Sequence, residues 1–225
     1  TGTITGALGI TIAHELGHKL DWREQWLARV LLMSVCYMHF HVEHNKGHHA
    51  RVATPDDPAS AREGQSLYAF LPQTLVGSFT SAWHFESARL AKAGKHGLHW
   101  KNQVLWGVAG SGVMLLLALV IGGVYGAVFF IAQSAVAIFL LEVVNYIEHY
   151  GLHRKPRESG GYERVEITHS WNASERFTNW FLFNLQRHSH HHVEHHRRYQ
   201  VLRSMEASPQ LPTGYAGMVL LALVP

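Results

Sequence analysis

The feature that most constrains the fold is a long uncharged segment. Between Lys101 and Glu142 the chain carries no charged residue, and its centre reads VLWGVAGSGVMLLLALVIGGVYGAVFFIAQSAVAIFLL. A helix that crosses a bilayer needs about 20 mostly apolar residues, and this segment is about twice that long. Gly122, Gly123 and Gly126 lie near its midpoint and predict a tight turn. We therefore predict a transmembrane helical hairpin over 104–147; a buried hairpin in a soluble protein is the alternative.

Basic residues flank this hairpin on both sides, and none lies at its tip. The sequence places Lys92, Lys95 and Lys101 before it and Arg154, Lys155 and Arg157 after it. By the positive-inside rule, both ends of the hairpin then face the cytoplasm. The chain also opens without Met in an apolar stretch, 1–13, and closes in another, so we expect an internal fragment that lacks N-terminal spanning helices.

Histidine is strongly over-represented, with 19 residues against 19 Lys+Arg and 16 Asp+Glu. Imidazole is the commonest metal ligand in proteins, so this excess predicts a metal site. The single cysteine, Cys36, excludes internal disulfides and thiolate-rich zinc or iron–sulfur sites. The net charge of +3 is too small and too scattered to indicate a nucleic-acid partner.

Nine histidines recur at metal-ligand spacings in four short clusters. They are His14 and His18; His44, His48 and His49; His149; and His188, His191 and His192. Residues at i and i+4 share one face of an α-helix and can share one metal. Because one metal takes at most about six ligands, nine imidazoles predict two metals. An all-nitrogen site suits iron, with copper as the competitor.

Two other functions use part of this pattern. His14-Glu15-Leu16-Gly17-His18 alone is typical of a zinc metalloprotease, in which Glu15 is the general base. The many further histidines argue against a protease, which needs one more ligand and little else. A membrane metal carrier needs polar residues in its spanning helices, and segment 104–141 has almost none.

The clusters also carry a family resemblance. HELGHK (14–19), EHNKGHH (43–49), NYIEHYGL (145–152) and LQRHSHHH (185–192) resemble the four histidine boxes of membrane-bound alkane monooxygenases. ATPDDPAS (53–60) and RRYQVLR (197–203) resemble the segments between the boxes, so the resemblance spans nearly the whole chain. Fatty-acyl desaturases and xylene-type monooxygenases are more distant relatives and remain alternatives.

The resemblance implies a fold, a reaction and partners. The fold is an all-α, multi-pass helical bundle of the bacterial inner membrane, with 1–225 as one catalytic domain and a histidine-rich di-metal site on the cytoplasmic side. The nine histidines hold two non-haem iron ions (Fe2+/Fe3+), and no catalytic residue beyond these ligands is expected. The reaction is O2-dependent hydroxylation of a medium- or long-chain n-alkane to a 1-alkanol. Electrons come from rubredoxin, which an NADH-dependent rubredoxin reductase supplies.

Six polar residues are candidates for contacts with the ligands. Metal-bound imidazoles commonly donate their outer N–H to a carboxylate or carbonyl. The candidates beside the boxes are Glu15, Glu43, Glu148, His41, Asn145 and His190. His190 stands where the family usually has aspartate, in the pattern His-Ser-Asp-His-His, so we expect it to be an outer group. Trp83, Trp100, Trp106 and Trp180 predict an interfacial belt at headgroup level.

Overall fold

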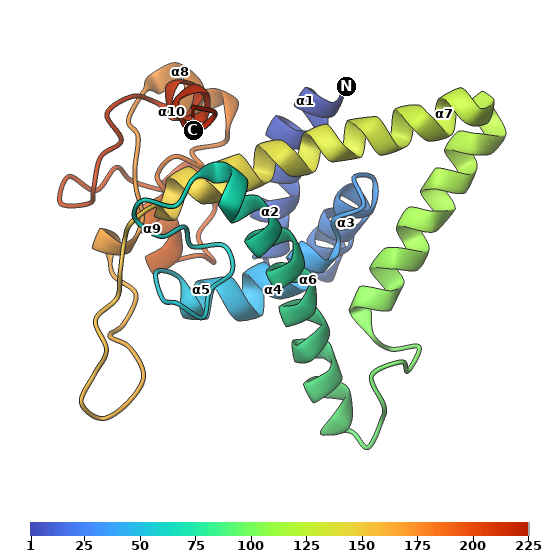
Figure 1. Cartoon of the computed structure of the whole chain (residues 1–225), viewed down its shortest axis with the longest axis horizontal. Coiled ribbons are helices and arrows are strands. Elements are labelled where there is room, and N and C mark those ends of the chain that lie inside the picture. Colours follow the sequence, from blue (N-terminus) through green and yellow to red (C-terminus); the bar gives the residue numbers. More distant parts are fainter. Residues whose placement is uncertain (225) are drawn as a thin grey trace. The chain divides into compact units, whose positions relative to one another are not determined.

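The computed structural model describes residues 1–224, and no β-strand forms within them (Figure 1). This confirms the all-α prediction. The first half of the chain forms α1 Gly2–Ile4, the π-helix η1 Thr5–Ile10, α2 Thr11–Gly17, α3 Trp22–Met33, α4 His39–Glu43, the π-helix η2 His44–His48, α5 His49–Arg51 and α6 Leu67–Ala91. The second half forms α7 Gln103–His149, the 3-10 turns η3 Ile167–His169 and η4 Tyr199–Val201, α8 Arg176–Phe181, α9 His188–Val193 and α10 Tyr215–Ala222.

Helix α7 contains the long apolar segment and is broken at Gly123. This residue has φ 61° and ψ −154°, a conformation that favours glycine, and the helix bends sharply near its middle (Figure 1). Only 6% of its most apolar 18-residue window is buried, and side chains such as Ile121 and Tyr125 are exposed. A core helix of a soluble protein would bury such residues. Among residues 1–224, α7 alone is long and apolar enough to cross a membrane.

Contacts divide the chain into two compact units. The first unit contains Thr1–Gly47 and Ser78–Leu141, and the second contains His48–Gly77 and 142–224. The boundary between Gly47 and His48 falls inside the π-helix η2.

In the first unit, α7 fixes the helices that carry the first histidine box. Gly6 approaches α7 so closely that a Cβ at this position would lie 2.9 Å from Ala137 Cα. Ser111 Oγ donates a hydrogen bond to the carbonyl of Met33, and Gln133 Nε2 donates one to the carbonyl of Ser34. The parts of α7 before and after Gly123 therefore both contact the end of α3. Helix α3 packs on α2 around a core containing Ile10, Ala13 and Leu32.

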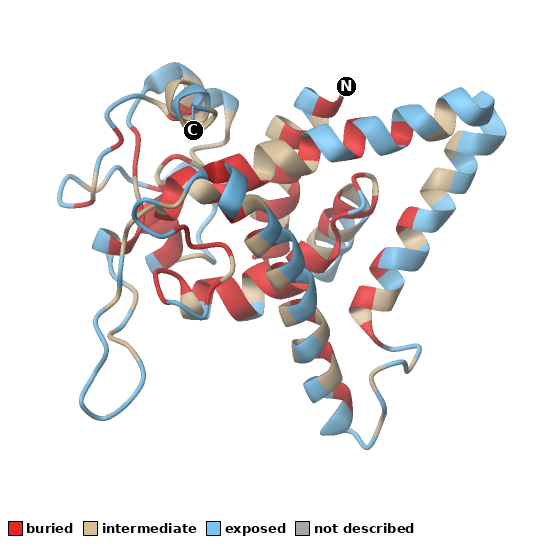
Figure 2. Cartoon of the chain, in the orientation of Figure 1, coloured by how far each residue is buried: buried red, intermediate tan, exposed pale blue. Residues whose placement is uncertain are grey.

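In the second unit, a packing contact and a hydrogen bond hold the loop 52–66 against its neighbours. Gly77 of α6 packs on Pro58, and Tyr146 of α7 donates a hydrogen bond to the carbonyl of Gln65. The apolar core contains Ile147, Ala173, Leu211 and Tyr215. Helix α9 is buried from His188 to His192 (Figure 2). These contacts position the loop and the end of α7, which carries His149, while His188, His191 and His192 lie in α9.

Candidate metal centre

Four histidines of the second unit converge in a buried group, which we call the four-histidine group: His48, His149, His188 and His192. Their ligand nitrogens all lie within 4.8 Å of one another. His188 Nε2 lies 3.2 Å from His149 Nε2 and 3.0 Å from His192 Nε2. Each residue is at most 4% exposed, so the site is closed to bulk water.

Hydrogen bonds on the outer nitrogens orient two of these rings. His48 Nδ1 donates to Asp57 Oδ2 at 2.9 Å, and His149 Nδ1 donates to the carbonyl of His169 at 3.2 Å. A neutral imidazole carries one proton. With that proton on Nδ1, the lone pair of each Nε2 faces the centre of the group, as in metal sites whose ligands have a carboxylate or carbonyl partner.

Asp57 is itself held in place within its loop. Its carboxylate accepts hydrogen bonds from Ser60 Oγ at 2.6 Å and from the backbone N–H of Ala59 at 3.2 Å. Burial raises the pKa of Asp57, but the His48 imidazole and the Ser60 hydroxyl together hold this pKa below its usual value. The carboxylate is therefore ionised and supports His48 as a donor to a cation.

The donor set of this group fits a metal ion. A single proton can bridge one pair of imidazole nitrogens, but it cannot satisfy several lone pairs that converge at 3.0–3.2 Å in a buried space. Four neutral nitrogens satisfy a borderline divalent cation such as iron, zinc or copper.

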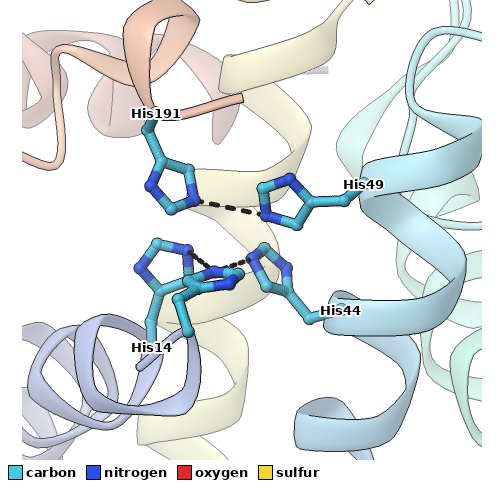
Figure 3. Close-up of side chains that lie close together, drawn as sticks. His14, His44, His49 and His191 are labelled. Atoms are coloured by element: carbon cyan, nitrogen blue, oxygen red, sulfur yellow. Dashed lines mark hydrogen bonds between the residues drawn. The ribbon is translucent and has the colours of Figure 1, made fainter. Parts of the chain in front are cut away.

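The first unit holds a second set, His14, His18 and His44, which we call the three-histidine set. His18 Nε2 lies 3.3 Å from His14 Nε2 and 3.1 Å from His44 Nε2. Figure 3 shows the rings of His14 and His44 turned toward one another. The ring of Phe40 stacks on His44, with centroids 4.7 Å apart. All three histidines are buried.

His49 and His191 form a facing pair within the second unit. Their Nε2 atoms lie 3.2 Å apart, and Figure 3 shows the two rings opposite one another. His49 also stacks on His192, with ring centroids 4.4 Å apart. All nine predicted ligands thus lie in the four-histidine group, the three-histidine set or this pair.

Helical spacing explains two of the clusters and fails for a third. His14 and His18, and likewise His188 and His192, meet as residues at i and i+4 should. His44 and His48 have the same spacing but join different groups, and the turn that carries them, η2, is a π-helix rather than an α-helix.

Glu148 and Asn145 occupy different positions around the four-histidine group. Glu148 Oε2 lies 3.2 Å from His188 Nε2, the nitrogen that faces the group, and its Oε1 accepts a hydrogen bond from Tyr215 at 2.7 Å. Asn145 Nδ2 instead donates to Glu142. Glu148 therefore adds a carboxylate at the metal-facing side of the group, and Asn145 contacts a neighbouring carboxylate.

His190 points away from the predicted ligands. Its Nδ1 accepts a hydrogen bond from the backbone N–H of Arg203 at 2.8 Å, and its Nε2 lies 3.6 Å from Glu194 Oε1. These two contacts occupy both ring nitrogens, and they agree with an outer position for this side chain.

The other three candidates lie in the first unit. Glu15 forms an ion pair with Lys19 at 2.9 Å, and Glu43 is buried at the end of α4. Burial, with the charges of Arg29 and Lys46, lowers the pKa of His41 to about 4. His41 is therefore neutral at cellular pH. The structure places these residues beside the predicted ligands without testing their roles, which stay predictions.

The sequence interpretation missed Asp57 and the carbonyl of His169. Asp57 lies in ATPDDPAS, a segment in which the sequence indicates only a polar loop and a family resemblance. A carboxylate between prolines in a polar loop is a signal for a fixed position, but it does not identify the imidazole that the carboxylate contacts. A backbone carbonyl leaves no signal in the sequence.

Comparison with known proteins identifies the family. The profile of the fatty acid desaturase family matches residues 1–221. The chain belongs to this family. It is 53% identical to Alkane 1-monooxygenase 2 of Pseudomonas aeruginosa over 224 residues, which are 100% of this chain and 59% of that protein. It is 42% identical to Alkane 1-monooxygenase of Acinetobacter baylyi over 224 residues, 100% of this chain and 55% of that protein.

A more distant member is the Xylene/toluene monooxygenase hydroxylase component of Pseudomonas putida, which is 28% identical over 227 residues, 99% of this chain and 58% of that protein. The chain spans less than two thirds of the length of these relatives. The resemblance to alkane monooxygenases is confirmed.

Proposed function

We propose that this chain forms the metal-binding part of an alkane 1-monooxygenase, which uses O2 to convert an n-alkane to a 1-alkanol. The four-histidine group, with its outer nitrogens held by Asp57 and His169, carries the proposal. Identity of 42–53% to proteins named alkane 1-monooxygenase supports the choice of reaction within the family.

The proposal includes two iron ions per chain. His48, His149, His188 and His192 offer one set of four nitrogens. The three-histidine set and the facing pair offer five more. We propose that the second ion takes its ligands from these remaining histidines. The absence of cysteine from the boxes favours iron over thiolate-bound zinc.

Bound iron would supply the electrons that reduce O2, and it would direct one oxygen atom to the substrate. The protein orients the ligand side chains and excludes water from the site. Asp57 and the His169 carbonyl fix the tautomers of His48 and His149. Tyr215 donates a hydrogen bond to Glu148, which holds that carboxylate beside His188. The buried setting keeps water away from a substrate that has no polar group of its own.

Rubredoxin, reduced by an NADH-dependent reductase, is the proposed electron donor, and the cytoplasmic face of the bacterial inner membrane is the proposed location of the site. Basic residues on both sides of α7 support this orientation. Single cysteines at His153 and Val124, in a Cys36→Ser background, test it with an impermeant thiol reagent in intact cells. We expect labelling at 124 and none at 153; the reverse pattern excludes a cytoplasmic site.

Turnover tests the reaction. The protein, expressed from its complete natural coding sequence, is supplied with octane, rubredoxin, its reductase, NADH and 18O2. We expect 1-octanol that carries 18O. Positioning effects of about 7–11 kcal/mol are large enough to favour the stronger terminal C–H bond over internal ones. An alkene product would replace the proposal with desaturation, and unlabelled alcohol would exclude a monooxygenase.

A further inference from the structure

A pocket in the first unit combines tryptophan side chains with positive charge. Its volume is 380 Å³, and it lies among α3, the end of α6 and the start of α7. Its lining includes three tryptophans and three basic residues: Trp26, Trp100, Trp106, Arg29, Arg89 and Lys101. The histidine groups contribute no residue to this pocket, so the metal centre does not explain it.

One of the three cations is already neutralised by the protein. Arg89 donates two hydrogen bonds to the carboxylate of Glu86, at 2.9 Å and 2.7 Å, and this carboxylate is fully buried. Glu86 also accepts hydrogen bonds from Lys46 and from the backbone N–H of Gln103. These partners outweigh burial and lower the pKa of Glu86 to about 2, so it is ionised and committed to this network.

Arg29 and Lys101 are the two cations that remain. Within residues 1–224, no carboxylate lies within ion-pair distance of either side chain. Arg29 Nε is buried and has no hydrogen-bond partner. A buried donor without a partner is costly, and an anion in the pocket would satisfy it.

Tryptophan rings indicate the depth at which this pocket would lie in a membrane. Arg29 lies over the ring of Trp26 at 5.7 Å, and Lys101 lies over the ring of Trp100 at 5.2 Å. Trp106 donates a hydrogen bond to the carbonyl of Trp100 and lies in the first turn of α7. Tryptophan and lysine at the start of a spanning helix mark the headgroup level of a bilayer.

A second pocket continues along α7 from the first. Its volume is 310 Å³, and Met38 lines both pockets. On α7 it is lined by Val104, Val108, Gly112 and Leu115. Gln103, in the first pocket, and Leu115 are separated by about 18 Å at 1.5 Å per residue. The lining is mostly apolar, and a Cβ at Gly112 would meet nothing within 4 Å.

We propose that the two pockets bind one anionic phospholipid, with its phosphate between Arg29 and Lys101 and one acyl chain along α7. A free phosphate would occupy only the first pocket, whereas a phospholipid accounts for the charge, the tryptophan rings and the apolar continuation. The inference does not depend on the proposed oxygenase reaction.

Native mass spectrometry of the protein, purified from its complete coding sequence in detergent, tests the site. The probes are dioleoyl phosphatidylglycerol, dioleoyl phosphatidylcholine and inorganic phosphate. We expect one phosphatidylglycerol per chain, retained in preference to phosphatidylcholine. Inorganic phosphate should not displace it, because phosphate gains nothing from the apolar pocket. Equal retention of the two lipids would overturn the proposal.

Variants separate the two halves of the site. Lys101→Gln and Arg29→Gln should each lower retention of phosphatidylglycerol about fivefold, since one basic residue near a lipid surface contributes about 1 kcal/mol. Lys92→Gln is the matched control, because Lys92 is an exposed lysine in the same segment and does not line the pocket. Equal effects of Lys101→Gln and Lys92→Gln would contradict a defined phosphate site.

Gly112→Leu tests the acyl-chain half. The open space at Gly112 accepts a larger side chain without a backbone clash, so this variant should fold and fill the second pocket. We expect it to lower lipid retention. Unchanged retention, or displacement of phosphatidylglycerol by inorganic phosphate, would reduce the site to one for small anions and overturn the phospholipid assignment.

Discussion

The four-histidine group and the three-histidine set use the same side chain but hold it in different ways. In the four-histidine group, hydrogen bonds donated to Asp57 and to the His169 carbonyl fix the rings of His48 and His149. In the three-histidine set, the ring of His44 packs flat against Phe40. A charged hydrogen-bond partner changes the basicity of a ligand as well as its orientation, whereas an apolar ring changes orientation alone.

Because their rings are held differently, we expect the two sets to respond differently to substitution. A neutral replacement of Asp57 should weaken metal binding through loss of charge, although the packing stays intact. A smaller replacement of Phe40 should act through loosened packing. Four variants test this expectation, and their effects on metal binding should decrease in the order in which they follow.

Removal of a ligand should have the largest effect. His192→Ala deletes one of the four nitrogens of the four-histidine group, and we expect loss of one of the two proposed irons together with all alkane hydroxylation. Elemental analysis of the purified protein, beside a hydroxylation assay, gives the measurement. Retention of both irons would remove His192 from the ligand set, and loss of both would show that the sets do not load independently.

Asp57→Asn should weaken metal binding at the four-histidine group by about 10- to 100-fold, as is typical when the partner of a metal-bound imidazole is changed. Asparagine keeps the size of the side chain and removes its charge. Competition with a chelator of known affinity measures the change.

Asp56→Asn is the matched control, because Asp56 is the adjacent aspartate and is exposed. Equal affinity changes in the two variants would mean that general charge, rather than the contact with His48, determines binding.

Phe40→Leu should have a smaller effect, confined to the three-histidine set. The side chain belongs to the apolar core of the first unit, and leucine should cost about 1 kcal/mol of folding free energy. Metal affinity should then fall about fivefold or less. Thermal unfolding and chelator competition measure the two quantities. If Phe40→Leu lowered metal affinity as much as Asp57→Asn does, packing and hydrogen bonding would not differ in their effect on the ligands.

His190→Asp should have the smallest effect. The ring contacts Arg203 and Glu194 and points away from the predicted ligands, so we expect iron content and hydroxylation close to those of the unmodified protein. Aspartate can still accept the hydrogen bond from the Arg203 N–H. Iron loss comparable to that of His192→Ala would place His190 among the ligands.

Local sequence patterns predicted those parts of the site that depend on regular helices. His14 with His18, and His188 with His192, meet because α2 and α9 present residues at i and i+4 together. The uncharged segment predicted α7, since apolar length is a direct requirement for crossing a bilayer.

The same local patterns could not predict contacts between segments that are far apart in the sequence. His48 donates a hydrogen bond to the carboxylate of Asp57, which lies in a loop. His149 donates one to the backbone carbonyl of His169. Neither partner has a fixed spacing from the histidine that it contacts. The association of His191 with His49 likewise depends on how α9 packs within the second unit, and not on its spacing from His188.

The π-helical turn at His44–His48 also limits how this region can change during evolution. Each residue of an α-helix turns the chain by about 100°. Deletion of one residue between His44 and His48 would therefore rotate His48 and His49 away from their present partners, even though every histidine is retained. Insertions and deletions should be rejected here as strictly as replacement of a ligand, while most single substitutions of Asn45 or Lys46 leave the turn intact.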